Sequence, residues 1–127
     1  MPVGGRHLDT QPVRSQYAEI EHIIGLVLGA AGSPPAGVVE ASTLKLRRCI
    51  DTLAPRVTHD ARELLLPGDP RRTAVEEVAD EAVHRARNVG PGCGLESAFA
   101  YCRGLARSVR ELRDLQRALA RVRDDGR

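Results

Sequence analysis

Two Glu-x-x-His motifs are the most conspicuous candidates for chemistry in this sequence. Glu19 and His22 form one motif, and Glu81 and His84 form the other. In four-helix bundles, two such motifs and a glutamate from each remaining helix hold a pair of iron or manganese ions. At about 100° per residue, however, His22, Glu81 and His84 fall on the side opposite the apolar stripes of their helices. Metal ligands must project inward, so we interpret these motifs as solvated charged faces and expect no metal or other cofactor.

A row of arginines is the second candidate, because it could bind phosphate or another anion. Its members share one face of the stretch over residues 94–124: Arg103, Arg107, Arg110, Arg117 and Arg121. Asp114 lies within this face and can pair with Arg110 and Arg117 at helical spacing. No aromatic residues are interleaved to stack on bases, and the net charge of the chain is only +2. The pattern therefore favours a solvated or partner-facing surface over a nucleic-acid site.

Nucleophilic chemistry has little support. The three cysteines form no Cys-x-x-Cys pair and are odd in number, which indicates free thiols in a reducing cytoplasm. The glycine-rich segment 90–94 resembles a phosphate-binding loop. No strand is predicted before it and no Lys-Ser/Thr pair follows it, so we predict a tight turn between helices. We assign no catalytic residue, and a non-enzymatic protein is favoured.

The elements that must position these residues are all predicted to be helices. The 127 residues suit one domain. Aromatic residues make up only 2% of the chain, so the core must be aliphatic, which suits close helix packing. Apolar residues recur with helical spacing and never alternate as in strands. We predict an all-α four-helix bundle. Its helices are expected at about 11–31, 38–66 with a kink at Pro55, 70–88 and 94–124. Residues 1–10 are expected to form a flexible tail before a single domain over 11–127.

Proline and glycine residues interrupt two of these predicted helices. Apolar residues keep their phase across Pro55, so one kinked helix is favoured over two helices, and both remain possible. Gly25 and Gly29 lie on one face of the first helix and predict close approach of a neighbouring helix. The kink and these glycines could also open an apolar cavity between helices for a small molecule.

The last predicted helix carries an apolar seam with a/d heptad spacing. The seam includes Leu105, Leu112, Leu115, Leu119 and Val122. Its final residues continue beyond the length that the helix over 70–88 could cover. An uncovered apolar seam needs a partner, and a second copy of the chain is the simplest one.

Two sequence blocks resemble a known family over roughly residues 43–112. The first block is Thr43-Leu44-Lys45 continuing into Leu53-Ala54-Pro55-Arg56-Val57. The second and more specific block is Gly90-Pro91-Gly92-Cys93-Gly94-Leu95, followed by Ala98, Ala100-Tyr101-Cys102-Arg103, Leu105-Ala106-Arg107 and Leu112. These blocks resemble short all-helical actinomycete proteins, common in streptomycetes, which are catalogued only as a domain of unknown function. The resemblance implies a compact helical domain and an actinomycete origin, and it implies no catalytic residues.

We expect a non-enzymatic interaction or regulatory module that self-associates through its C-terminal helix. The beginning of the chain has no apolar signal sequence, and the longest apolar run is too short to cross a bilayer. We therefore expect a cytoplasmic protein without a membrane partner, most simply a homodimer. The alternative is a small-molecule-binding bundle or small enzyme with an apolar cavity between helices. Nucleic-acid binding through the arginine face is less favoured.

Overall fold

The computed structural model describes residues 17–126, and every regular element within this range is a helix. A helix over residues 17–29 is followed by α2 (Ala36–Leu64), α3 (Pro70–Asn88) and α4 (Leu95–Asp125). The predicted all-α class and the long C-terminal helix are confirmed. The predicted tail over 1–10 and the first residues of the helix expected at 11–31 lie outside the described range.

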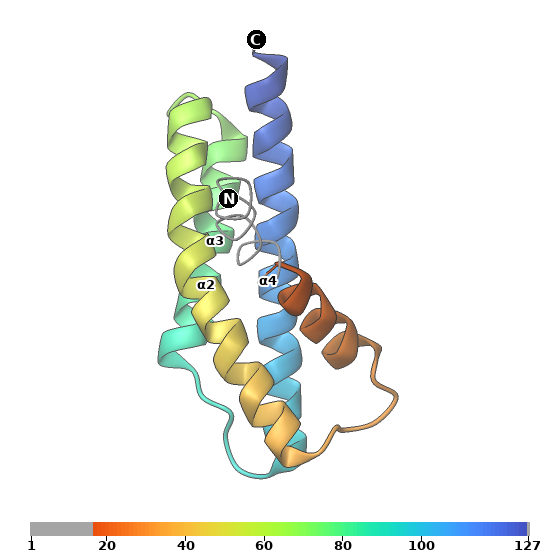
Figure 1. The fold of residues 1–127 in the computed structure, drawn as a ribbon. Coiled ribbons are helices and arrows are strands. Elements are labelled where there is room, and N and C mark those ends of the chain that lie inside the picture. Colours follow the sequence, from red (N-terminus) through yellow and green to blue (C-terminus); the bar gives the residue numbers. More distant parts are fainter. Residues whose placement is uncertain (1–16, 127) are drawn as a thin grey trace, which may run out of the picture.

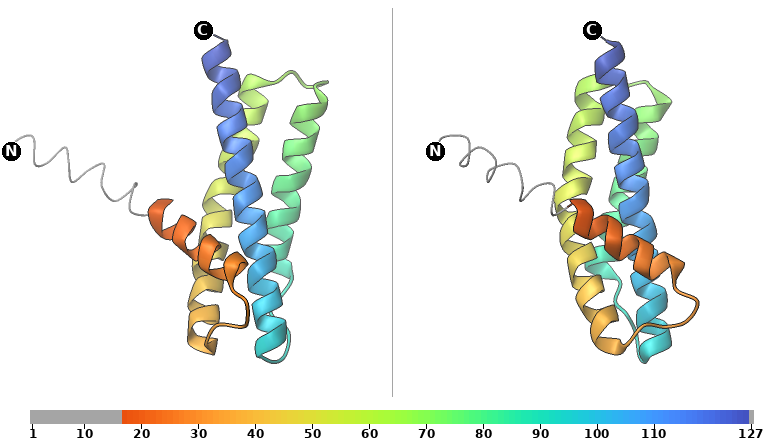
Figure 2. Two further views of the ribbon diagram at one scale, coloured as in Figure 1. Left: turned by 90° about the vertical axis from the view of Figure 1, so that its right-hand side faces the viewer. Right: turned by 45° about the vertical axis from the view of Figure 1, so that its right-hand side comes forward.

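Three long helices lie side by side and alternate in direction (Figure 1). Both α2 and α4 begin at the lower end of the view in Figure 1, and α3 runs in the opposite direction. The helix over 17–29 is shorter and crosses α2 and α4 obliquely (Figure 2). This arrangement is compatible with the predicted four-helix bundle, with one member short and oblique.

Pro55 lies inside α2 and does not end it, as the preferred single-helix prediction expected. Leu53 and Val57 are buried on either side of it, whereas Pro55 itself is exposed. A proline in a helix interior removes one backbone hydrogen bond and destabilises the helix by about 3 kcal/mol. Burial of the apolar face on both sides of Pro55 offsets that loss, so the helix continues.

Local capping chemistry sets the beginning of α3. The Asp69 side chain accepts a hydrogen bond from the Arg71 backbone N–H at 2.9 Å, and Pro70 occupies the first turn. An aspartate N-cap satisfies a backbone donor that the helix leaves free, and proline loses nothing at that position. The predicted beginning of this helix at residue 70 is confirmed.

A glycine-rich connection over residues 89–94 precedes α4; a tight turn was predicted here, and the segment is more open, with a bend at Cys93 and Gly94. Gly92 and Gly94 have φ angles of +70° and +87°, a region that side chains disfavour. The Ser97 hydroxyl donates to the Pro91 carbonyl oxygen at 2.6 Å and holds the connection against the first turn of α4. A Cβ atom on Gly92 would lie 2.6 Å from the Ser97 Oγ atom, so this position requires glycine on both counts.

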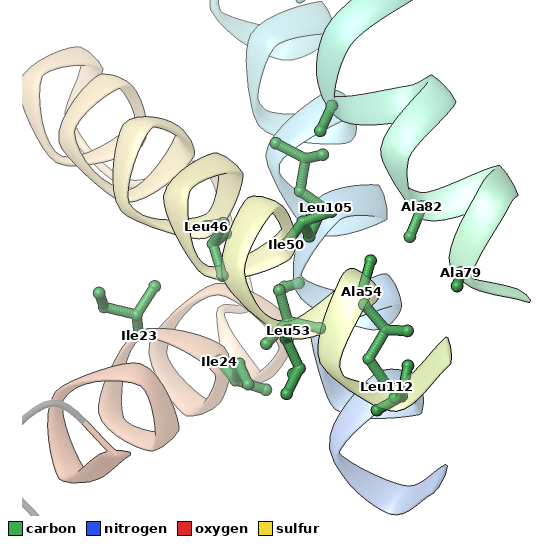
Figure 3. Packing of buried hydrophobic residues seen from close by; sticks show 14 of the residues in the cluster. Ile23, Ile24, Leu46, Ile50, Leu53, Ala54, Ala79, Ala82, Leu105 and Leu112 are labelled. Carbon is green, nitrogen blue, oxygen red and sulfur yellow. The ribbon is translucent and has the colours of Figure 1, made fainter. Parts of the chain in front are cut away.

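The core is a layer of aliphatic side chains between the helices (Figure 3). Leu46, Ile50, Leu105 and Leu112 are among its largest fully buried members. In contrast, α3 contributes mainly small side chains, because its buried residues are Val75, Ala79, Ala82 and Ala86. Small side chains along this face allow α3 to approach α2 and α4 closely.

The prediction of close helix packing at Gly25 and Gly29 is wrong. No described atom lies within 4 Å of the place where a Cβ atom would sit at either residue. The helix over 17–29 buries only the side that carries Ile23, Ile24 and Val27, and Leu26 is exposed. Because this helix lies on the outside of the bundle, its second apolar side has no described neighbour to cover it.

Candidate functional site

The four residues of the two Glu-x-x-His motifs do not come together. Glu19 pairs with Lys45 of α2, and Glu81 pairs with Arg85 at 3.3 Å along α3. The His84 ring nitrogen lies 3.1 Å from the Asn88 amide, and His22 is exposed. Within residues 17–126, no group of three or more His, Cys, Asp or Glu side chains is arranged to hold a metal ion. The carboxylates of these motifs serve instead as partners for nearby basic side chains.

The arginine face divides into residues with different surroundings. Arg117 pairs with Asp114 at 3.1 Å and with Glu21 at 3.5 Å. The Arg103 guanidinium lies over the Phe99 ring at 5.6 Å, and its buried Nε atom has no hydrogen-bond partner among the described residues. The other three members are exposed and form no ion pair with any residue in the described range: Arg107, Arg110 and Arg121. The five arginines therefore do not share one environment, and anion binding by this face stays a prediction.

Arg113 was not among the residues predicted to be functional. It connects α4 to the helix over 17–29. Its side chain is only 12% exposed and pairs with Glu21. The guanidinium also lies over the Tyr17 ring, with its carbon 5.3 Å from the ring centroid. Glu21 is 92 residues away in the sequence, so no local spacing could have indicated this pair.

The leucines proposed as a dimer seam belong to the core of the chain itself. Leu105 and Leu112 are 0% exposed, and Leu119 is 4% exposed. Leu115 and Val122 are partly buried against the same core. The premise that this seam lacks a covering helix is wrong, because α2 has 29 residues and packs along α4. Arg123 of α4 pairs with Asp60 of α2 at 3.4 Å near the far end.

A polar network crosses the bundle where α3 ends. The Tyr101 hydroxyl donates to the Arg85 carbonyl oxygen at 2.7 Å and accepts from an Arg47 nitrogen at 3.2 Å. The Arg85 side chain in turn donates to the Ser108 hydroxyl at 2.8 Å and to the Gly104 carbonyl oxygen at 3.3 Å. These polar groups satisfy one another, so the network joins the three long helices.

Two open grooves mark the surface of the bundle. The smaller, of about 340 Å³, borders Pro55 between α2 and α3 and includes the polar residues His59, Arg62 and Asp80. Neither Gly25 nor Gly29 lines either groove. The alternative prediction was an apolar cavity opened by the Pro55 kink and the helix glycines. The surface near Pro55 forms a shallow groove with α3, lined by both apolar and polar side chains.

The larger groove, of about 710 Å³, lies where α2 and α4 begin. We call it the bundle-end groove, and its lining residues are Ala36, Gly37, Val39, Glu40, Ala41, Thr43, Leu44, Arg47, Pro91, Gly94, Leu95 and Ala98. Seven large apolar side chains are exposed in the described range. Four of them lie in the first turns of α2, in the α3–α4 connection or at the start of α4: Val38, Leu44, Val89 and Leu95. Two of these four, Leu44 and Leu95, line the bundle-end groove, so part of its wall is apolar and exposed to solvent.

A family model described as "Family of unknown function (DUF6415)" matches residues 18–121. The chain belongs to this family. The match is broader than the resemblance seen over residues 43–112 and spans all of α2 and α3 and most of α4. Comparisons with curated proteins and with solved structures found no match. An actinomycete origin stays a prediction.

In this member of DUF6415, burial limits the reactivity of two cysteines. Burial raises the pKa of the Cys102 thiol, and a hydrogen bond with the Thr43 side chain opposes this rise only in part. Burial likewise raises the pKa of Cys49. The nearby positive charge of Arg113 lowers this pKa, but its effect is the smaller of the two. Cys93 is exposed in the loop before α4. Since the thiolate is the nucleophilic form, Cys49 and Cys102 are core residues and not candidates for covalent chemistry.

A membrane-spanning helix was not expected from the sequence. None of the helices in the described part of the chain is both long enough and apolar enough to cross a membrane.

Proposed function

We propose that this protein is a non-enzymatic helical interaction module that acts as a homodimer through its bundle-end groove. The observation that supports this most directly is the exposure of Leu44 and Leu95, which are 50% and 42% exposed at the groove. Clustered apolar side chains on a protein surface typically mark a binding site. Fully burying an exposed leucine is worth roughly 1.5–3 kcal/mol, so covering one that is already half-buried stabilises a complex by about half of that.

The surface proposed here differs from the seam expected from the sequence. Leu105, Leu112 and Leu119 already stabilise the folded chain, so a partner cannot cover them without unfolding it. Leu44 and Leu95 are accessible without any change of the bundle. Self-association therefore remains the proposal, and the start of α2 replaces the end of α4 as its site.

The surroundings of the polar side chains support a non-enzymatic role. The polar network near the end of α3 consists of Tyr101, Arg47, Arg85 and Ser108. Each of these side chains hydrogen-bonds to another side chain of the network or to the backbone. Groups used in this way are held in place by the fold and have little capacity left for a substrate.

Sedimentation equilibrium at tens of micromolar protein tests the proposal. We expect a dimer for the wild-type chain and a monomer for Leu44→Glu, with the dissociation constant raised about 100-fold or more. Leu66→Glu is the matched control, because Leu66 is 78% exposed in the α2–α3 turn at the opposite end. A wild-type monomer at these concentrations would contradict the proposal, as would a Leu66→Glu variant that dissociates equally.

Binding of a small molecule is the second candidate, favoured by the size of the bundle-end groove. A volume of about 710 Å³ lies within the range of roughly 300–1,000 Å³ that is typical of ligand pockets. Isothermal titration with 8-anilinonaphthalene-1-sulfonate, an amphipathic anion, tests this. Saturable binding to a wild-type monomer, abolished by Leu95→Glu, would favour the ligand site over the dimer.

A further inference from the structure

Three exposed residues of α2 follow one another at intervals of four. They are Glu40, Leu44 and Arg48, and all three side chains are accessible. At about 100° per residue, each step of four turns the side chain by only about 40°, so the three lie on one face. At 1.5 Å per residue, each charge lies about 6 Å along the helix axis from Leu44. The face therefore carries an apolar centre between one acidic and one basic end.

We propose that two copies of the chain pair through α2 in an antiparallel arrangement centred on Leu44, with Glu40 of each copy against Arg48 of the other. This inference rests on the proposed self-association and adds its geometry. A two-fold axis through Leu44 brings the two leucines together and repeats the Glu40–Arg48 contact on both sides. Such an isologous contact is self-complementary, which is what a closed dimer requires.

The other charged side chains near Leu44 already have partners within the chain, whereas Glu40 and Arg48 are available to a second copy. Lys45 pairs with Glu19, Arg47 donates to the Tyr101 hydroxyl, and Asp51 pairs with Arg87 at 3.1 Å. Glu40 and Arg48 are the only other charged residues between positions 40 and 51. Neither makes an ion pair or a side-chain hydrogen bond with another residue in 17–126.

The order of the charges selects the direction of pairing. A parallel arrangement centred on Leu44 would place Glu40 against Glu40 and Arg48 against Arg48. Like charges held together at an interface disfavour the complex, whereas opposite charges set its register. The antiparallel arrangement replaces both repulsions with attractions and keeps the leucine contact. It also brings Leu44 of each copy to the rim of the other copy's bundle-end groove, where Leu95 is exposed.

Charge reversal tests this geometry, with sedimentation equilibrium of the full chain as the readout. Glu40→Arg alone places two arginines opposite each other at both contacts, and Arg48→Glu alone places two glutamates there. We expect each variant to raise the dimer dissociation constant at least about tenfold. An equimolar mixture of the two variants should form a heterodimer with opposite charges at both contacts. The double variant Glu40→Arg/Arg48→Glu should dimerise like the wild type.

The control is Glu77→Arg, because Glu77 is exposed on α3 and forms no ion pair with any other described residue. It should dimerise like the wild type. Circular dichroism should show unchanged helix content for every variant, since all the substituted side chains are exposed. Single variants that dimerise like the wild type, or a mixture that stays monomeric, would overturn the antiparallel register.

The two proposals fail in different ways. If the wild type dimerises and Leu44→Glu does not, but the charge-reversed mixture stays monomeric, the bundle-end contact stands and the antiparallel register is wrong. If the wild type is a monomer at tens of micromolar, both proposals are wrong.

Discussion

The hydroxyl of Tyr101 in α4 donates a hydrogen bond to the backbone carbonyl oxygen of Arg85 in α3 at 2.7 Å. That carbonyl lies in the last turn of α3, where backbone acceptors lack partners within the helix. The same hydroxyl accepts a hydrogen bond from Arg47 of α2, whose guanidinium carbon lies 5.2 Å from the Tyr101 ring centroid. One side chain thus satisfies the end of α3 and connects all three long helices.

Replacing Tyr101 with phenylalanine should destabilise the fold by about 1 kcal/mol or more, because a partly buried carbonyl would lose its partner. Urea unfolding followed by circular dichroism measures the change. Tyr17→Phe is the control, since the Tyr17 hydroxyl makes no hydrogen bond within residues 17–126. Equal unfolding midpoints for the two variants would show that the Tyr101 hydroxyl contributes nothing to the stability of the fold.

Leu112 distinguishes a core seam from an exposed dimer seam. Leu112→Ala should lower the free energy of unfolding by about 2–5 kcal/mol, because it leaves a cavity in a fully buried site. Leu66→Ala, at an exposed position, should change it by no more than about 0.5 kcal/mol. Unfolding at protein concentrations below the dimer dissociation constant measures the monomer alone. If Leu112 only contacted a second copy, Leu112→Ala would leave the free energy of unfolding of the monomer unchanged.

The N-cap of α3 should make part of the stability depend on pH. The hydrogen bond from the Arg71 side chain, followed by that from the Arg71 backbone N–H, lowers the pKa of Asp69 below its ordinary value. The folded chain therefore holds the Asp69 carboxylate charged at a lower pH than the unfolded chain does. The charged Asp69 carboxylate therefore stabilises the folded chain at any pH above the ordinary aspartate pKa of about 3.9. This stabilisation is lost as the pH falls through the lower pKa that Asp69 has in the folded chain.

Asp69→Asn keeps a capping oxygen and removes this titration. The wild type should have the higher thermal midpoint at neutral pH, and the difference should shrink as the pH falls below about 4. Asp80→Asn provides the control, because Asp80 is exposed and makes no ion pair in the described part of the chain. A difference between wild type and Asp69→Asn that stays constant with pH would contradict the linkage.

Short-range signals explain why much of the fold was predictable. Asp69 and Pro70 mark the beginning of α3 by chemistry that acts within one turn. Gly94 precedes α4 in a conformation that favours glycine. The phase of Leu53 and Val57 around Pro55 correctly indicated one helix. Each of these features depends on residues that are neighbours in the sequence.

Errors arose where the outcome depended on which helices become neighbours. The a/d seam of α4 was correctly read as apolar, but its covering helix was taken to be the short α3 instead of α2. Gly25 and Gly29 were expected to contact a helix, yet both are exposed and have no described atom within 4 Å of their Cβ positions. The Arg113–Glu21 pair connects residues far apart in the sequence, and no spacing rule indicates it.

The sequence by itself determined the approximate bounds of α2, α3 and α4, because apolar period and turn chemistry are local. It also contained the spacing of Glu40, Leu44 and Arg48. Only the tertiary structure decided which charged residues near them are engaged, since the partners of Lys45, Arg47 and Asp51 come from three other helices. The partners of exposed side chains follow from the packing of helices, and packing is settled only when the whole core assembles.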